Sequence, residues 1–381
     1  YNYNNISAFL NLTGSHTFYK RIDYFKKQDL VLEDTTFTQI LGINDTICYQ
    51  GNTIHQGCNN PNHEHYTIDS DEARFAETDW KIFPGFTVKL GANWNIDQFH
   101  NIFFNTGVLS KAPQFSDVFD YDNNIMDFSS NEIVEAIEFG YGYRSSKFAL
   151  NFNAYNTSWQ NKPETGSIAL PGGETGTYSL INMNALHRGI ELDFAWKLSD
   201  AFKYEFLFSI GGWKWTSRDA VRLTFYNQQL VETSPVNADG LYVGDSPQTQ
   251  IGSSISYNYK IKHNINGYIK LKGVYFDKFY SDFNPYDLAE DIEVSNEELR
   301  NVWKMPGYAL FSLHLGNTFY LEKSSIDFKF NILNLFDNIY INDAENNAAT
   351  IPAVLQEYNA ESAAGFPGLG RKTIMSIEYK F

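Results

Sequence analysis

The sequence predicts an all-β protein, a transmembrane antiparallel β-barrel of which this chain forms a partial barrel of about twelve strands. Three observations support this fold class. Apolar and polar residues alternate over long stretches, short and long connections alternate along the chain, and aromatic residues are abundant while charged residues are scarce. Alternation in steps of two is typical of strands with one apolar and one polar face. In a membrane barrel these faces meet lipid and the lumen.

Composition favours lipid-facing strands. Aromatic residues make up 17% of the 381 residues, with 31 Phe and 25 Tyr, and charged residues only 19%. Soluble globular chains carry about 25% charged residues, whereas barrels need apolar outer faces and aromatic girdles at both membrane interfaces. Composition leaves one alternative open, an aromatic-rich secreted soluble β-protein that binds or hydrolyses glycans.

Hydropathy and charge exclude several classes of protein. The chain has no apolar run of about 18 residues, the length that a transmembrane helix needs. A mean hydropathy of -0.38 suits barrel strands, which are only half apolar. The net charge of -16 argues against a nucleic-acid partner, because phosphate contacts require a basic surface. The chain begins at Tyr1 without a secretory signal, and since a strand starts almost at once, we expect a fragment.

The clearest alternation runs from Gly189 to Leu198. Its apolar face carries Ile190, Leu192, Phe194, Trp196 and Leu198, and its polar face carries Glu191, Asp193 and Lys197. In chain order, comparable faces predict strands within Ile6–Tyr24, Phe86–Ile96, Ile102–Val108, Ile133–Tyr143, Phe148–Ala154, Tyr204–Ile210, Ile251–Tyr259, Ile265–Tyr275, Ala309–Leu315, Ile326–Ile332 and Gly368–Phe381. We expect these strands to reach the about 9–11 residues that a tilted membrane strand needs.

The alternation changes phase after Gly211 and Gly212, where the apolar series passes from Ile210 to Trp213 and Trp215. A change of phase at glycines predicts a β-bulge. The two tryptophans are then candidates for the aromatic girdle.

Short and long connections alternate strictly. The tight turns are expected at Asp97–Gln98, Ser145–Ser146, Ser199–Phe202, Lys260–Lys262 and Tyr320–Lys323. The long polar connections are Asp29–Glu77, Lys111–Asn131, Gln160–Tyr178, Thr216–Gly240, Ser281–Lys304 and Asn338–Phe366. A compact soluble domain rarely has so many long loops. A barrel with short turns at one rim and long loops at the other is typical of the outer membrane, where periplasmic turns are short and extracellular loops are long.

The last strand ends on an aromatic carboxyl terminus. Its apolar face carries Met375, Ile377, Tyr379 and Phe381, and the other face carries Ser376, Glu378 and Lys380. A soluble protein usually frays at its last residues. An alternating strand at this position suits the closing strand of a barrel in the outer membrane of a Gram-negative bacterium.

Several segments together resemble the carboxy-terminal part of the β-barrel of TonB-dependent outer-membrane receptors, closest to the Bacteroidota type. The resemblance covers essentially the whole chain. It rests on Gly91–Asp97, His100–Gly107, Ser110–Pro113, Asp117–Phe119, Glu135–Tyr143, Asn184–Leu192, Ser209–Trp215, Val243–Gln248, Asn331–Asp337 and Gly368–Phe381.

The resemblance implies a receptor that binds a scarce nutrient at the cell surface and releases it inward when TonB pulls on an amino-terminal plug. Residues 1–381 would form the carboxy-terminal portion of a barrel of about 22 strands, with the signal peptide, plug, TonB box and early strands absent from this sequence. The implied partners are outer-membrane lipid, the TonB complex through the plug, the barrel-assembly machinery and a small-molecule or oligosaccharide ligand. Tyr379 and Phe381 would help that machinery recognise the barrel. A passive outer-membrane channel stays open as an alternative.

The sequence offers candidates for the ligand site and the lumen. The loop aromatics Tyr121, Trp159, Tyr178 and Tyr242 either stack on a ligand or sit in the girdle. Acidic loops disfavour an anionic ligand, but they do not choose between a siderophore, a glycan and a cobalamin-like compound. The residues expected to line the lumen are Lys89, Asn93, Asn95, Asn151, Asn153, Glu191 and Asp193.

Cys48 and Cys58 are the two cysteines, and both lie in one long polar segment. The main prediction is a disulfide that closes a loop in an oxidising compartment. The alternatives are a Zn or Cu site and two free thiols. The metal alternative would add His55, His63, Glu64 and His65.

The sequence contains no enzyme motif, since Gly-x-Ser-x-Gly, His-Glu-x-x-His and a phosphate-cradling loop are all missing. We therefore expect neither catalysis nor a cofactor. The segment Asp120–Asn124 resembles a calcium loop faintly but lacks the required Gly and Glu, so a solvated acidic loop is expected. His100 and His187 are expected to form hydrogen bonds in the lumen or at its rim.

Overall fold

The computed structural model describes residues 2–3, 5–23, 27–32, 35–50, 53–57, 63–74, 76–119, 125–126, 129–169, 174–226, 229–261, 264–283, 302–346 and 363–381. Within these residues the regular structure is strand, apart from one short 3-10 helix at Phe115–Asp117. None of the described helical structure is long and apolar enough to cross a membrane.

One antiparallel sheet of thirteen strands dominates the fold. In sheet order its strands are β1 (Asn2–Tyr3), β2 (Ile6–Tyr19), β11 (Lys81–Asn95), β12 (His100–Lys111), β13 (Glu132–Arg144), β14 (Phe148–Gln160), β17 (Ala185–Lys197), β18 (Phe202–Trp215), β21 (Thr249–Ile261), β22 (Ile265–Asp277), β25 (Tyr308–Tyr320), β26 (Ser325–Leu333) and β29 (Lys372–Lys380). Apart from the two-residue β1, all are long. The prediction of about twelve membrane-length strands is confirmed.

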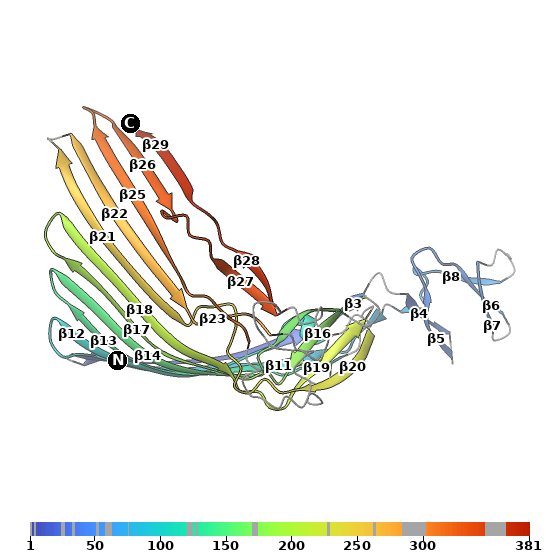
Figure 1. Ribbon diagram of the computed structural model, residues 1–381. Coiled ribbons are helices and arrows are strands. Elements are labelled where there is room, and N and C mark those ends of the chain that lie inside the picture. The colour runs from blue at the N-terminus through green and yellow to red at the C-terminus, as the bar shows by residue number, and fades with distance from the viewer. Residues whose placement is uncertain are drawn as a thin grey trace.

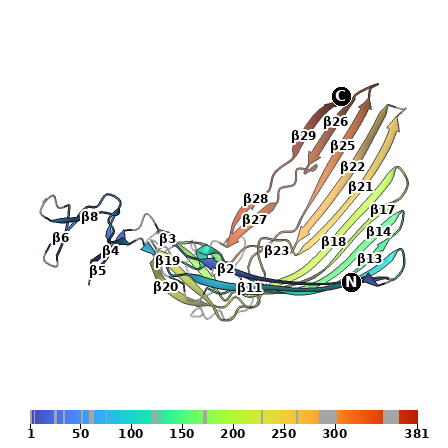
Figure 2. The same cartoon turned by 180° about the vertical axis from the view of Figure 1, so that it is seen from behind.

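The sheet curves into a trough that is open along one side (Figures 1 and 2). In the described part of the chain, β1 and β29 are its two edge strands. Each main-sheet strand from β11 onward pairs with the next main-sheet strand along the chain, so the sheet has no crossover in this part.

Turn lengths confirm the predicted short–long alternation. The connections at 96–99, 145–147, 198–201, 262–264 and 321–324 are short. Those at 20–80, 112–131, 161–184, 216–248, 278–307 and 334–371 are long. Figure 1 shows the short turns along one rim of the trough and the folded long connections at the other. We call these the short-turn rim and the long-loop rim.

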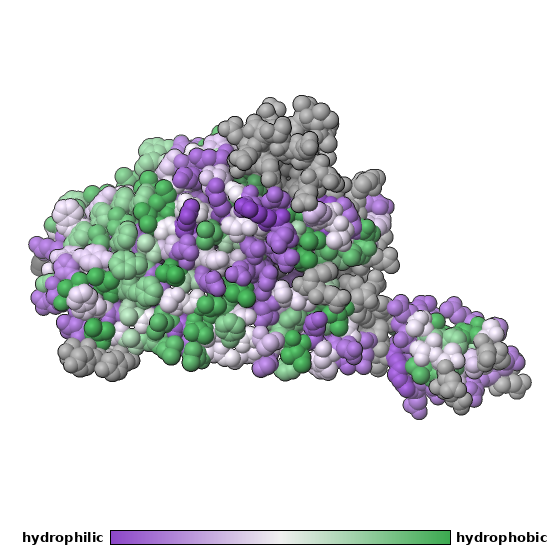
Figure 3. Space-filling view, turned by 90° about the horizontal axis from the view of Figure 1, so that it is seen from below, coloured by the Kyte–Doolittle hydropathy of each residue, from purple (hydrophilic) through white to green (hydrophobic). Residues whose placement is uncertain are grey.

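Cross-strand register arranges the apolar residues in rows on one face. One row runs through Trp94, Ile102, Tyr141, Phe152, Leu192, Phe208, Ile251 and Tyr275. Large apolar side chains on this face stay exposed, among them Leu12 at 67% and Trp94 at 50%. Figure 3 shows apolar residues spread over the strands and polar residues gathered nearer the long-loop rim. Such a surface suits contact with lipid.

An aromatic belt follows the apolar face near the short-turn rim. Its rings touch in series, with centroids 6.0 Å apart for Tyr143 and Phe148, 5.6 Å for Phe148 and Phe194, and 5.7 Å for Phe194 and Tyr204. Phe202 and Tyr257 continue the belt at 4.6 Å. Tyr and Trp rings favour the membrane interface because one end is apolar and the other polar.

The predicted bulge at Gly211 and Gly212 is wrong. β17 and β18 keep one register from Ala185 opposite Trp215 to Lys197 opposite Lys203. No extra residue is inserted, so residues 210 and 213 point to opposite faces. Trp213 and Trp215 therefore lie on the concave face and are not part of the lipid-facing girdle.

The long connections contain strands that the sequence did not predict. Small sheets are formed by β5 (Thr35–Leu41), β4 (Gln28–Leu32) and β9 (Ala73–Arg74), by β7 (Thr53–Gln56), β6 (Ile47–Gln50) and β8 (Glu64–Tyr66), and by β15 (Glu164–Ala169), β16 (Thr175–Ile181), β19 (Ala220–Tyr226) and β20 (Gln229–Val236). Paired strands are β3 (Ile22–Asp23) with β10 (Ala76–Glu77), β23 (Phe279–Tyr280) with β24 (Lys304–Met305), and β27 (Ile341–Asn346) with β28 (Ala363–Pro367). In residues 28–73 a separate apolar core forms around Leu30, Leu41 and Ile47.

The Asn-Leu-Phe-Asp segment closes β26 with a fixed turn. Asn334 has a left-handed backbone with φ 49°, and its amide donates to the carbonyls of Asn338 at 2.9 Å and Leu369 at 3.2 Å. Its side-chain oxygen accepts the Asn338 N–H at 2.9 Å. Asp337 accepts the N–H of Arg371 at 2.7 Å. Two side chains thus fasten both ends of the connection to β29.

Candidate functional site on the concave face

The predicted lumen residues share the face opposite the apolar rows. Register places Lys89, Asn93, Asn95, Asn151, Asn153, Glu191 and Asp193 there. Glu138 joins them by accepting the amides of Asn105 at 3.1 Å and Asn153 at 2.7 Å. Asn151 donates to Asp193 at 2.9 Å. The wall is held by cross-strand polar bonds, which is typical of a lumen surface.

Charged groups on the later strands are also paired across the wall. Glu205 of β18 accepts Ser254 at 2.8 Å and the ammonium of Lys270 at 2.9 Å. Asp327 of β26 pairs with Lys380 of β29 at 2.6 Å. Each carboxylate bonds to a side chain on a neighbouring strand. These pairs therefore help to fix the strand order, and they give the concave face a polar surface.

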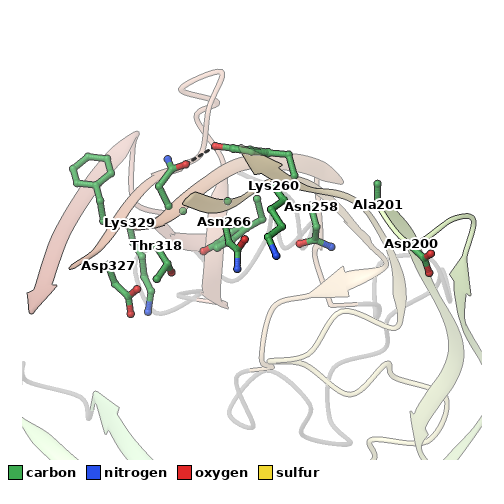
Figure 4. A pocket seen from close by; sticks show the side chains of 14 residues that line it. Asp200, Ala201, Asn258, Lys260, Asn266, Thr318, Asp327 and Lys329 are labelled. Carbon is green, nitrogen blue, oxygen red and sulfur yellow. Dashed lines mark hydrogen bonds between the residues drawn. The ribbon is translucent and has the colours of Figure 1, made fainter. Parts of the chain in front are cut away.

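A groove of about 540 Å³ lies on the wall near the short-turn rim. Figure 4 shows the side chains of Lys260, Asn266, Thr318 and Lys329 pointing from four neighbouring strands toward the interior. Beside them the ring of Tyr268 covers Gly316, where an added Cβ would lie 2.2 Å from the ring. Amide, hydroxyl and ammonium groups here suit a polar guest.

Near the long-loop rim, three of the four predicted ligand aromatics come together. Trp159, Tyr178 and Tyr242 pack against one apolar cluster. Its buried members are Leu180, Met183, Ala185, Trp215, Ala220, Val236, Ala238, Leu241, Tyr280, Phe283 and Val302. The fourth candidate, Tyr121, lies outside the described residues. The long connections after β14, β18 and β22 all contribute, so the cluster joins separate loops.

Ring stacking organises this aromatic cluster. Tyr242 and Tyr280 stack with centroids 4.2 Å apart and planes 3° from parallel, and the Lys214 ammonium lies 4.6 Å from the Tyr242 ring. His187 stacks on Trp213 at 5.3 Å. Its Nε2 has no hydrogen-bond partner among the described residues, so the hydrogen bond expected for this histidine is not seen at that nitrogen. The sequence did not single out Tyr280, because an isolated aromatic residue in a polar segment carries no periodic signal.

Three buried ring nitrogens in the cluster and beside it have no hydrogen-bond partner among the described residues. They are Trp159 Nε1, His187 Nε2 and Trp215 Nε1. The three residues are side by side on β14, β17 and β18. Buried polar groups are normally satisfied, so these three nitrogens are exceptions within an apolar setting that closes them off from solvent.

Ionisable groups of the long loops surround the cluster. Burial, followed by the nearby carboxylates of Asp282, Asp343 and Glu345, raises the pKa of Asp245 to about 6. Burial raises the pKa of Asp282 and lowers that of the Lys162 ammonium. The shifts point to one crowded acidic environment in which Lys162 is the neutralising cation.

Cys48 is buried and disulfide-bonded, whereas Cys58 lies outside the described residues. Their pairing therefore stays a prediction. In register Cys48 stands between His55 and His65, but a disulfide sulfur is not the thiolate that zinc requires. Among the described residues no group of three His, Cys, Asp or Glu is placed to hold a metal. The segment Asp120–Asn124 lies outside them.

Tyr379 and Phe381 lie on the apolar face of the edge strand. Tyr379 pairs in register with Ile326, and its ring lies 6.0 Å from that of Phe381. Both side chains are exposed, Phe381 at 99%. Their role in assembly is not tested by this position and stays a prediction.

Membrane-length strands, an aromatic belt, short turns at one rim and folded loops at the other define the class of outer-membrane β-barrels. The chain belongs to the family described as TonB dependent receptor-like, beta-barrel, which matches residues 61–335. The predicted family, fold class and location in the outer membrane of a Gram-negative bacterium are confirmed. The Bacteroidota subtype stays a prediction.

Three solved structures share the fold. The ferric-catecholate import receptor Fiu from E. coli K12 is 14% identical, with 98% of this chain and 42% of that chain covered and a TM-score of 0.51. The ferric yersiniabactin uptake receptor FyuA from Yersinia pestis is 14% identical over 81% and 39% of the two chains, with a TM-score of 0.50. The copper transporter OprC is 14% identical over 80% and 40%, with a TM-score of 0.53.

The chain spans about two-fifths of the length of these relatives. At 14% identity the likeness shows the fold alone. Comparison with curated proteins gave no match.

Proposed function

We propose that the chain is the carboxy-terminal portion of an outer-membrane receptor for TonB-dependent uptake of a scarce nutrient, acting in transport rather than catalysis. The observation that carries the proposal is the division of the concave face. A polar, charge-paired wall leads toward the short-turn rim, while the long loops bring aromatic rings together at the opposite end. Capture by the loops followed by passage along a polar wall fits this arrangement.

The fold relatives support a metal-related nutrient. Fiu and FyuA are described as receptors for iron chelates and OprC as a copper transporter. A siderophore is therefore favoured over a glycan or a cobalamin-like compound as the first ligand to test. The acidic long loops oppose a highly anionic chelate, so a neutral or cationic metal complex fits better.

Trp159, Tyr178 and Tyr242 are proposed as ligand contacts, because they share one cluster at the loop end. Tyr121 is kept as a candidate from the sequence. Trp159 Nε1 has no partner among the described residues but is buried, so it would donate to an oxygen-rich ligand once the loop residues packed on it move aside. Energy coupling would come from the TonB complex through a plug, and Tyr379 with Phe381 would serve recognition by the assembly machinery.

Uptake by cells that carry or lack the full-length gene tests the function. We expect deletion to abolish energised uptake of at least one labelled probe among a ferric catecholate, a copper complex, cobalamin and an oligosaccharide. A protonophore should have the same effect. Uptake lost on deletion but insensitive to the protonophore would show a passive channel instead. A protein that stayed soluble and monomeric after detergent removal would refute the membrane receptor altogether.

Trp159→Phe then tests the proposed contact, because it keeps the ring and removes the N–H. We expect weaker binding of the transported ligand with unchanged stability. Phe115→Leu is the matched control, since Phe115 is an exposed aromatic outside the cluster. Equal binding by both variants would refute the role of Trp159.

A further inference from the structure

Four long loops meet at one group of ionisable residues, which we call the acidic junction. It consists of Lys162, Asp245, Asp282, Asp343 and Glu345. Lys162 follows β14, Asp245 follows β18, and Asp282 follows β23. Asp343 and Glu345 belong to β27 in the last long connection. The junction therefore links loops that leave the barrel between four different strand pairs.

Direct backbone contacts bring these loops together. The N–H of Asp282 donates to the carbonyl of Ala344 at 3.1 Å, and Asp282 forms a bridge with Glu345. The N–H of Asp245 donates to the carbonyl of Tyr280 at 3.3 Å. These contacts hold the carboxylates of three loops close to one another even though their charges repel.

The charges of the junction do not balance. Four of its side chains are carboxylates and one is an ammonium, and Glu164 already forms an ion pair with that ammonium. Glu132 at the start of β13 also acts on Lys162. Around Asp245 the described neighbours are Asp282, Asp343, Glu345 and Lys162, so three carboxylates oppose one cation. Ionisation of the whole group therefore weakens the contact between loops.

We propose that the acidic junction is a latch that holds the long loops together in acid and releases them as the pH rises. Protonated carboxyl groups no longer repel one another and donate hydrogen bonds to their neighbours. That release of the loops opens the way for a ligand rests on the proposed receptor function. The latch itself concerns only contacts between loops of this chain.

The direction follows from the raised pKa values. In the joined loops Asp245 titrates at about 6 instead of its ordinary 3.8, and the pKa of Asp282 is raised in the same direction. A carboxyl group with a raised pKa favours the joined state while it is protonated, and this contribution is lost as the pH rises through that pKa. For Asp245 alone, the equilibrium for opening increases at most about tenfold between pH 5 and pH 8. The Asp245 residue is exposed, so solvent screening reduces this value well below tenfold, and the latch rests on the backbone contacts that join the loops more than on this one carboxylate.

Hydrogen exchange of the full-length protein in lipid nanodiscs tests the latch without any ligand. Backbone amides of residues 240–246, 278–283 and 341–346 would be followed at several pH values and corrected for the pH dependence of intrinsic exchange. We expect opening, expressed as corrected exchange, to increase several-fold between pH 5 and pH 8. The corrected exchange rates of the main-sheet amides should not change with pH, which would show that the barrel stays intact.

The double variant Asp245→Asn with Asp282→Asn removes two charges and should stay protected at pH 8. Lys162→Met removes the cation and should shift release to a lower pH. Asp200→Asn is the matched control, because Asp200 is an exposed carboxylate in a short turn that pairs with Lys197 at 2.8 Å. Corrected exchange that is flat with pH in the wild type, or unaltered by the double variant, would overturn the latch. Since no transport is measured, failure of the receptor function would leave this result intact.

Discussion

Replacing Ile190 by arginine tests whether the apolar face of the sheet meets lipid. Ile190 lies near the middle of β17, between Ala154 and Ile210 in register, and is 40% exposed. An arginine at the bilayer midplane destabilises a barrel by about 2–4 kcal/mol. That is a roughly 30- to 1,000-fold loss in the folding equilibrium constant at about 1.4 kcal/mol per factor of ten. On the surface of a soluble protein the same change stays within about 0.5 kcal/mol.

The assay is urea unfolding of the full-length protein in lipid vesicles, followed by tryptophan fluorescence and by heat-dependent migration on gels. The matched control is Glu191→Arg, one residue further along β17. Glu191 faces the concave wall opposite Asn153 and Ser209, where a polar substitution contacts water or polar groups. We expect the control to lose less than about 1 kcal/mol. The assignment of faces would be refuted if Ile190→Arg were harmless or if Glu191→Arg were the more damaging change.

Three further changes test local features. Gly316→Val puts a side chain where the Tyr268 ring lies, since a Cβ there would be 2.2 Å from it. We expect this variant to lose about 1–3 kcal/mol of the free energy of unfolding in the same titration. The control Gly14→Val should change little, because a Cβ on Gly14 has no neighbour within 4 Å. Equal effects of the two variants would contradict the packing of Tyr268 on Gly316. Asn334→Ala removes the bonds that hold the last long connection and should expose residues 338–371 to protease within an intact barrel. Unchanged cleavage would argue against that role. Cys48→Ser should speed hydrogen exchange in residues 28–74, because loss of the disulfide removes about 2–4 kcal/mol of stabilising free energy. Two thiols that react with a thiol reagent in the unfolded wild type would contradict the disulfide.

Strand positions and faces were predictable because period-two alternation is a local property. A residue's face follows from its parity within the strand, so the apolar stripe of Gly189–Leu198 fixed the orientation of β17 before any contact was known. The short turns were equally predictable, since the number of residues between two alternating segments sets the length of the turn. Register then followed from the turns, as for Asn95 opposite Asn101 across the first of them.

The interior of the long connections was not predictable in the same way. Strands such as β6 and β8 have few residues and no sustained alternation. They exist because they pack on a local core around Ile47 and because Cys48 is cross-linked. Pairing between distant segments decides these elements, and a window of sequence does not contain the partner. The same reason explains why Tyr280 and Asp282 entered the candidate site only through the structure.

The tryptophans on β17 and β18 show where the rule that an apolar alternating series faces lipid holds and where it fails. Trp196 continues the apolar series of its strand and lies exposed in the aromatic belt, with its ring 6.5 Å from Phe148. Trp215 is equally apolar, yet it is only 3% exposed and lies on the concave face under the loop residue Phe283. Interpreting every apolar series as lipid-facing required a bulge to carry Trp213 and Trp215 outward. The continuous register removes that need, because near the long-loop rim the concave face is itself covered by apolar residues. Aromatic residues that break phase at the end of a barrel strand therefore indicate where loops pack into the barrel, and here they mark the end of the wall at which the ligand candidates gather.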